Sequence, residues 1–180
     1  MKAEGRRPKA ESRPLAFIAL GSNLGDARAN VLSALECLQT LSAGPLQRSS
    51  LWKTTPVDCP PGSPPFINAV VALAPAAGET PESLLPKLQA LEAEFGRASR
   101  RGRNEPRPLD LDLLAFGDEV RSTPQLTLPH PRLHRRRFVL VPFDEIAPDL
   151  VLPGQAQSVR ELLAALRSSE VVQRLDVEDT

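Results

Sequence analysis

The sequence is poor in aromatic residues and cysteines, and it has no excess of charge of either sign. Aromatic residues make up 4% of the 180 residues, so aliphatic side chains must fill the core. Two cysteines, Cys37 and Cys59, are too few for a disulfide framework and lack the spacing of a metal site, which fits a reducing compartment. With 22 basic and 22 acidic residues the formal net charge is zero, whereas proteins that bind nucleic acid in bulk are usually basic.

Long hydrophobic runs are also missing. No apolar stretch approaches the roughly 20 residues of a membrane-spanning helix. The segment LAFIAL (15–20) is shorter than the roughly 7–15 residues of a secretory signal core, and no small-residue cleavage site follows it. We therefore expect a cytoplasmic protein that does not act at a membrane, with a flexible tail over residues 1–13 and a single domain over residues 14–180.

The hydrophobic pattern predicts strands and helices in the order β-α-β-β-α-β, followed by an appendage. This order is typical of an α+β fold of the ferredoxin-like split βαβ type, an antiparallel sheet with helices packed on one face. A doubly wound α/β fold is the competing interpretation, and two successive strands around the proline-rich loop 55–65 disfavour it. The expected strands are 15–20, 47–54, 66–73 and 109–116, and the expected helices begin near Asp26, Thr80 and Ser158.

Two aspartates, Asp110 and Asp112, interrupt a run of leucines in the last of these strands. Side chains at i and i+2 of a strand share a face, so both carboxylates point away from the core that Leu109, Leu111 and Leu113 enter. Paired oxygen ligands at this spacing suit Mg²⁺, which takes one or two carboxylates together with water and substrate phosphates. The alternative is an ordinary solvent-facing strand, although aspartate is disfavoured in strands.

Two arginine clusters flank this strand. One lies within residues 97–107 and the other within residues 132–137, beside His130 and His134. Guanidinium groups bind phosphate in a bidentate, planar way. A solvated basic loop or an RNA-binding patch would explain the arginines alone, but acids that hold a metal and arginines that hold phosphate together favour a magnesium–polyphosphate site.

Two weaker features remain. The segment GSNLGD (21–26) follows the first strand but lacks the G-x-x-x-x-G-K-[ST] pattern of a phosphate-binding loop, so a plain turn explains it equally well. Asn68 is an amide inside an apolar strand. A buried amide must find hydrogen-bond partners, either in the local backbone or on the edge of a flat polar ring.

Six stretches of the sequence follow one another in the order of a known family. Among them, PRPLDLDLLAFG (106–117) and LPHPRLHRRRFVLVPF (128–143) are the most specific. Over roughly residues 16–153 the chain resembles 6-hydroxymethyl-7,8-dihydropterin pyrophosphokinase. The resemblance implies the ferredoxin-like fold and, in folate biosynthesis, transfer of pyrophosphate from ATP to 6-hydroxymethyl-7,8-dihydropterin, which gives AMP and the pterin diphosphate.

The resemblance also implies a role for each residue that matches the family pattern, with two Mg²⁺ ions as cofactor. It assigns metal binding to Asp110 and Asp112, and catalysis to Arg97, Arg107 and Asp112. The implied ATP contacts are Gln89, Glu92, Arg97, Arg107, Leu113, His130 and Arg136. The implied pterin contacts are Asn23, Thr54, Thr55, Val57, Phe66, Asn68 and Phe138.

Two other functions would use the same residues. A metal-dependent nuclease or nucleotidyltransferase would employ the acids and arginines, and an RNA-binding module would employ the basic segments. We expect instead a monomeric enzyme whose partners are two small molecules, ATP and the pterin, with no nucleic acid bound.

Overall fold

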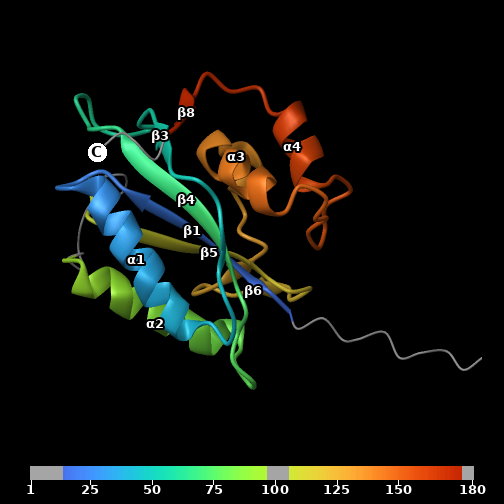
Figure 1. Cartoon of the computed structure of the whole chain (residues 1–180). Coiled ribbons are helices and arrows are strands. Elements are labelled where there is room, and N and C mark those ends of the chain that lie inside the picture. Colours follow the sequence, from blue (N-terminus) through green and yellow to red (C-terminus); the bar gives the residue numbers. More distant parts are fainter. Residues whose placement is uncertain (1–13, 97–105, 176–180) are drawn as a thin grey trace, which may run out of the picture.

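The computed structural model describes residues 14–96 and 106–175, and its main feature is a twisted antiparallel sheet with helices on both faces (Figure 1). The principal strand order is β5-β1-β4-β3-β8, and the short strand β2 also pairs with β4. The strands are β1 (Ala16–Ser22), β2 (Gln47–Arg48), β3 (Trp52–Thr54), β4 (Phe66–Leu73), β5 (Asp110–Phe116) and β8 (Val172–Arg174). The predicted ferredoxin-like α+β fold is confirmed.

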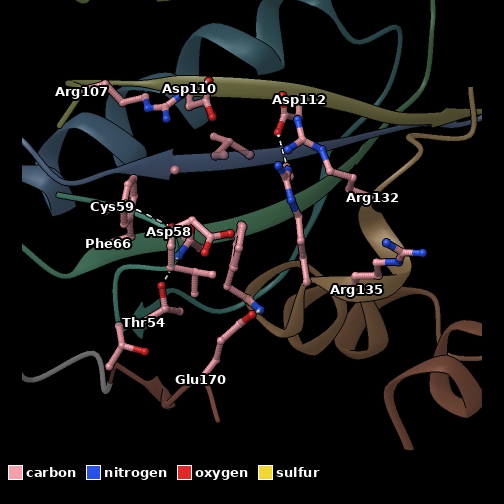
Figure 2. Close-up of a pocket in the computed structure, with 18 of the residues that line it drawn as sticks. Thr54, Asp58, Cys59, Phe66, Arg107, Asp110, Asp112, Arg132, Arg135 and Glu170 are labelled. Atoms are coloured by element: carbon pink, nitrogen blue, oxygen red, sulfur yellow. Dashed lines mark hydrogen bonds and ion pairs between the residues drawn. The ribbon is translucent and has the colours of Figure 1, made fainter. Parts of the chain in front are cut away.

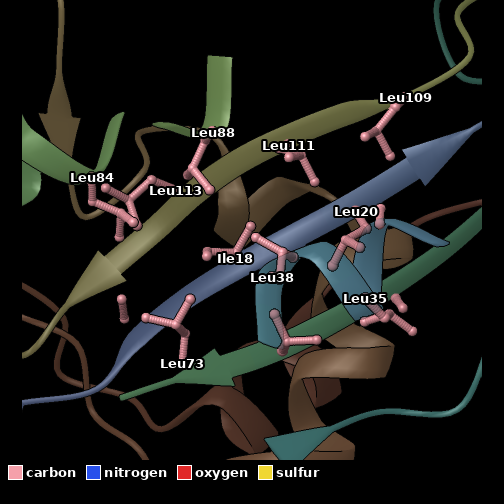
Figure 3. Packing of buried hydrophobic residues seen from close by; sticks show 14 of the residues in the cluster. Ile18, Leu20, Leu35, Leu38, Leu73, Leu84, Leu88, Leu109, Leu111 and Leu113 are labelled. Carbon is pink, nitrogen blue, oxygen red and sulfur yellow. The ribbon is translucent and has the colours of Figure 1, made fainter. Parts of the chain in front are cut away.

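Helices α1 (Ala27–Leu41) and α2 (Pro81–Glu94) cover one face of the sheet. Each begins at a side chain that caps it, because Asp26 accepts a hydrogen bond from the Ala29 N–H and Thr80 accepts one from the Ser83 N–H. Their leucines pack with those of the strands (Figure 3). The labelled members of this core are Ile18, Leu20, Leu35, Leu38, Leu73, Leu84, Leu88, Leu109, Leu111 and Leu113.

The second face of the sheet is covered by the appendage, for which the sequence predicted a helix near Ser158 and otherwise only short elements. It contains the 3₁₀ turn Leu133–Arg135 and the helices α3 (Arg137–Ile146) and α4 (Val159–Ala165). A separate core forms there, in which the rings of Phe17 and Phe143 lie 5.0 Å apart. Because both faces are covered, the central strands β1 and β4 are apolar almost throughout rather than alternating.

Three details differ from the sequence prediction. The single strand expected over 47–54 is divided into β2 and β3, because Ser50 turns its N–H away from the sheet to Glu145. Leu32, one of the apolar residues of the helix that was expected to begin near Asp26, is 40% exposed rather than buried. Strands β8 and β6 (Arg121–Ser122) were not predicted, whereas β7 (Thr127–Leu128), which pairs with β6, lies where a short strand was expected within residues 126–150.

No helix in the two described stretches combines the length and the hydrophobicity that crossing a membrane requires. Residues 1–13, which were expected to form a flexible tail, lie outside the described residues.

Candidate functional site

A cavity of about 820 Å³ opens on the α3 face of the sheet, above the ends of β1, β4 and β5 (Figure 2). Its floor comes from the strands, one wall from loop 55–65 and the opposite wall from residues 130–138. The lining residues are Ala19, Leu20, Gly21, Thr54, Thr55, Val57, Asp58, Cys59, Phe66, Asn68, Arg107, Asp110, Asp112, His130, Arg132, Arg135, Arg136, Phe138 and Glu170.

The alternation of β5 places both aspartates in this cavity. Leu109, Leu111 and Leu113 are buried under the helices of the other face, whereas Asp110 and Asp112 face the opening. Across the ladder, Gly21 pairs with Asp110 and Ala19 pairs with Asp112. These two small residues leave open space above β1, so the carboxylates border a hollow rather than a packed core.

Arginines reach both carboxylates. The Arg107 Nη1 lies 3.1 Å from Asp110 Oδ1, and the Arg136 Nη1 lies 3.3 Å from Asp112 Oδ2. Burial and the neighbouring Asp110 charge raise the pKa of the Asp112 carboxyl, while Arg136 and Arg107 lower it. The balance is a raised pKa, so more positive charge than the arginines supply would stabilise this pair of acids.

The donor set fits magnesium. Two carboxylates on one strand face supply hard oxygen ligands, and no cluster of three or more His, Cys, Asp or Glu side chains suited to a metal occurs within residues 14–96 and 106–175. Mg²⁺ usually keeps several water molecules and is bound by one or two carboxylates plus substrate phosphates. Asp110 and Asp112 are therefore the residues that would hold such an ion.

His130 lies at the charged end of the cavity as a neutral imidazole. Its Nδ1 accepts a hydrogen bond from the Arg132 N–H at 3.2 Å, and its own backbone N–H donates to the Leu114 carbonyl. Burial, with help from the charges of Arg136 and Arg132, lowers the pKa of His130 to about 4. The ring is thus uncharged at neutral pH, and because Nδ1 accepts, the proton lies on Nε2, which can donate a hydrogen bond to a ligand.

The other end of the cavity, which we call the amide end, contains an amide, two aromatic rings and the Glu170 carboxylate. Asn68 is buried on β4, and its Nδ2 donates to the Thr54 Oγ1 at 2.7 Å. Gly21 pairs with Asn68 across the sheet, and a Cβ on this glycine would lie only 2.8 Å from the Asn68 Oδ1. Phe66 on β4 and Phe138 on α3 also line the cavity, and the guanidinium carbon of Arg136 lies 5.6 Å from the centre of the Phe138 ring. An oriented amide beside two rings can recognise the edge of a flat heterocycle.

Most of the residues expected to form the site come together in this cavity. Those that line it are Thr54, Thr55, Val57, Phe66, Asn68, Arg107, Asp110, Asp112, His130, Arg136 and Phe138. Arg97 lies outside the described residues. The cavity lining does not include Asn23, Gln89, Glu92 or Leu113.

Asn23 is a buried link between two walls of the cavity. Its backbone N–H donates to the Arg107 carbonyl at 3.1 Å, and its Oδ1 accepts the Arg107 N–H at 2.9 Å. Its Nδ2 donates to the Pro64 carbonyl at 3.3 Å. Asn23 therefore ties loop 55–65 to the segment that carries Arg107.

The other three lie on the α2 side of β5. The Leu113 side chain packs in the core with Leu84 and Leu88 (Figure 3). The buried Glu92 Oε1 accepts the Leu111 N–H at 2.7 Å, and Gln89 is exposed one helical turn before it. Glu92 thus satisfies a backbone donor of the edge strand that carries the aspartates.

Several lining residues were not among those expected. The small side chains of Ala19 and Gly21 could have been found from their alternate positions in the first strand. Arg132 and Arg135 belong to the arginine cluster already noted. Glu170, from the segment after α4, had no such signal in the sequence.

Several proteins whose sequences are similar to this chain carry the same name. Residues 17–148 match the family model described as 7,8-dihydro-6-hydroxymethylpterin-pyrophosphokinase. Proteins called 2-amino-4-hydroxy-6-hydroxymethyldihydropteridine pyrophosphokinase are similar as well. The one from Haemophilus influenzae is 39% identical over 158 residues, which cover 87% of this chain and 96% of the relative. The one from Pseudomonas aeruginosa is 41% identical over 150 residues, which cover 83% and 90%.

Solved structures support the fold. The crystal structure of wild-type Plasmodium falciparum HPPK-DHPS with pteroate superposes with a TM-score of 0.66 at 14% identity. The match covers 84% of this chain and 42% of that one, so the present chain spans less than half of that protein. At this identity the likeness shows the fold alone.

Proposed function

This chain belongs to the 7,8-dihydro-6-hydroxymethylpterin-pyrophosphokinase family, and we propose that the cavity above β1 and β5 is the active site in which it carries out the family's reaction. The enzyme transfers the pyrophosphoryl group of ATP to the hydroxymethyl group of 6-hydroxymethyl-7,8-dihydropterin. The products are AMP and the pterin diphosphate, and the reaction belongs to folate biosynthesis.

One observation supports this assignment of the site most strongly. A single cavity has a charged end with two carboxylates and several arginines, and an amide end with an oriented amide and two aromatic rings. ATP requires the first kind of surface and the pterin requires the second. Transfer of a phosphoryl-type group needs little covalent chemistry from the protein, so bringing the two substrates together and neutralising charge are the main tasks.

At the charged end, we assign Asp110 and Asp112 as ligands of two magnesium ions. Bound magnesium would neutralise the polyphosphate and lower the pKa of the attacking hydroxyl group. Arg107, together with Arg97, grips the phosphates and stabilises the charge that develops in the transition state. Asp112 orients the hydroxyl group of the pterin toward the phosphorus.

The remaining ATP contacts surround these groups. Arg136 and the neutral His130 lie in the cavity wall. Gln89 and Glu92 lie on the α2 side of β5, outside the cavity lining, and only the resemblance assigns them to the nucleotide. Leu113 contributes through its main chain because its side chain is buried on the opposite face.

At the amide end, the pterin lies between the rings of Phe66 and Phe138, and Asn68 forms hydrogen bonds with its edge. Thr54, Thr55 and Val57 form the rim on the other side of the ring. Asn23 acts from beneath, through its bonds to Pro64 and Arg107.

We further propose that the chain acts as a cytoplasmic monomer, in which residues 14–180 form one catalytic domain after a tail of residues 1–13.

The identity of the nucleotide product tests the function. The protein is incubated with Mg²⁺ and ATP, with and without the hydroxymethyl dihydropterin, and the nucleotides are separated by chromatography. We expect AMP that forms only with the pterin. ADP would instead indicate transfer of a single phosphoryl group, and nucleotide turnover without the pterin would favour a nuclease or nucleotidyltransferase.

A further inference from the structure

The segment after α4 passes along the amide end of the cavity and contributes a carboxylate to it. Glu170 lines the cavity at the end opposite Asp110 and Asp112 (Figure 2). Its Oε2 accepts the backbone N–H of Phe138 at 3.0 Å, at the first turn of α3. That N–H has no partner within the helix, because the first N–H groups of any helix lack one. Glu170 therefore fixes the residue whose ring borders the cavity.

The same segment is bonded to the opposite wall. The Thr55 N–H donates to the Val171 carbonyl at 3.1 Å, and the Val171 N–H donates to the Thr55 Oγ1 at 3.2 Å. Strand β8 then pairs with β3, where Val172 lies opposite Thr54. The Thr54–Thr55 pair and Phe138 come from distant parts of the sequence, and this one segment holds all three residues.

Both ends of the segment are anchored. Leu166 packs against the α3 face of the sheet, while Leu175 packs against the α1 face and donates its N–H to the Leu51 carbonyl at 2.9 Å. The backbone on either side of Glu170 is thus fixed by packing and by hydrogen bonds. A carboxylate on such a backbone can hold a neighbouring group in one orientation without first being ordered by substrate.

We propose that Glu170 is a positioning residue of the pterin end of the site, which holds the N-terminus of α3 and thereby sets the ring of Phe138 for stacking. This inference rests on the proposed function, because it takes the amide end of the cavity as the place where the pterin binds. Glu170 needs no contact with the substrate for this role. It acts through the Phe138 N–H, and the segment that carries it also steadies the Thr54–Thr55 rim.

Substitutions that keep or remove the hydrogen-bond acceptor test the proposal. Glu170→Ala removes it, and Glu170→Gln retains an amide oxygen that can accept the same N–H. Loss of the hydrogen bond to the Phe138 N–H should raise the KM for the pterin about five- to tenfold. The KM for ATP should stay within about twofold in both variants, and Glu170→Gln should restore the pterin KM to within about twofold of the wild type.

A matched control separates positioning from helix capping in general. Glu161 also accepts a backbone N–H at the start of a helix, that of Ser158, but it is exposed and does not line the cavity. Glu161→Ala should lower the melting temperature and leave both KM values unchanged. If Glu170→Ala behaves in the same way, Glu170 only caps α3 and the proposal is wrong. If Glu170→Gln is as impaired as Glu170→Ala, the lost charge matters rather than the acceptor, which also overturns it.

A further variant and a further measurement keep the test decisive. Glu170→Met, which keeps a side chain of similar length, replaces Glu170→Ala if the alanine variant does not fold. Hydrogen exchange of the peptide that contains Phe138, measured without substrates, should be faster in Glu170→Ala than in the wild type and normal in Glu170→Gln. This readout needs no activity. Absence of pterin-dependent AMP from the wild type would therefore refute the proposed function, whereas unchanged exchange in Glu170→Ala would refute the role of Glu170.

Discussion

The Arg136 Nη1 lies 3.3 Å from Asp112 Oδ2, so an arginine pairs with a carboxylate that we assign to the metal. Arg107 pairs with Asp110 in the same way. The two acids that seemed out of place in a leucine-rich strand are therefore each paired with an arginine, which offsets part of the cost of placing them together. When magnesium and ATP bind, each partner of these pairs has a new counter-charge available, since the metal attracts the carboxylates and the phosphates attract the guanidinium groups.

The first prediction concerns these carboxylates. Asp112→Asn and Asp110→Asn should each lower kcat at least roughly 1,000-fold, because each removes a charge that would hold the metal or orient the attacking group. The fold should survive in both. For Asp112→Asn, loss of the Arg136 pair is offset by relief of burial and of repulsion from Asp110, the two effects that raise the pKa of this carboxyl. Steady-state AMP formation and thermal unfolding measure the two effects.

Asp118→Asn is the matched control for both variants. Asp118 is exposed in the turn after β5 and does not line the cavity, so its kcat and melting temperature should equal those of the wild type. Substantial turnover by Asp112→Asn, in a protein that unfolds like the wild type, would contradict the assignment of this residue.

A second prediction follows from the close approach of β1 to Asn68. In Gly21→Ala the new Cβ would lie 2.8 Å from the Asn68 Oδ1, so the amide has to shift away from its bond to Thr54. The KM for the pterin should rise about tenfold or more, because a misplaced amide no longer matches the ring edge. The KM for ATP should change little. Pterin binding by calorimetry, with a non-hydrolysable ATP analogue present, gives an independent measurement.

Gly44→Ala controls for the added methyl group. A Cβ at Gly44 meets only Ala74, at an ordinary contact distance of 4.0 Å, and Gly44 does not line the cavity. Equal pterin affinity in Gly21→Ala and Gly44→Ala would show that the close contact with Asn68 has no role in recognition.

A third prediction concerns pH. The pKa of His130 is lowered from 6.5 to about 4, first by burial and then by Arg136 and Arg132. The unfolded chain therefore takes up a proton below about pH 6.5, while the folded protein does so only near pH 4. Between these values the unfolded state binds more protons, so stability falls as the pH is lowered. The loss should reach at most about 3 kcal/mol.

Urea unfolding at a series of pH values, without metal or nucleotide, measures this dependence. His130→Gln should lose less stability than the wild type between pH 6.5 and pH 4. His134→Gln, which changes the only other histidine, serves as the control and should follow the wild type. Identical pH profiles for His130→Gln and the wild type would contradict the lowered pKa.

Most of what the sequence could predict came from patterns among neighbouring residues. The alternation of leucine and aspartate places Asp110 and Asp112 on one face, and Thr80 followed by Pro81 marks the start of α2. Features that depend on distant partners were missed. The break between β2 and β3 arises because Glu145, 95 residues later, accepts the Ser50 N–H. Glu170 enters the site only because β8 pairs with β3, and a three-residue strand has too little periodicity to be recognised.

The last prediction concerns that distant partner. The Glu145 Oε2 accepts hydrogen bonds from the Ser50 N–H at 2.9 Å and the Trp52 Nε1 at 3.1 Å, and its Oε1 accepts one from the Ser50 Oγ at 2.7 Å. Burial tends to raise the pKa of Glu145, but these bonds and Arg174 outweigh it and lower the pKa. Glu145→Ala should therefore destabilise the protein by about 2 to 3 kcal/mol near neutral pH, since it leaves the donors of Ser50 and Trp52 without their acceptor.

Because the folded-state pKa of Glu145 is lowered, its contribution is present above the unfolded value of 4.5 and is lost as the pH falls through the folded value. The difference in unfolding free energy between the wild type and Glu145→Ala should accordingly shrink in acid, and urea unfolding at neutral and acidic pH measures it. Glu36→Ala, at an exposed position of α1, should change stability by no more than about 0.5 kcal/mol. A loss in Glu145→Ala as small as that would show that α3 is held on the sheet by its apolar face, without help from this carboxylate.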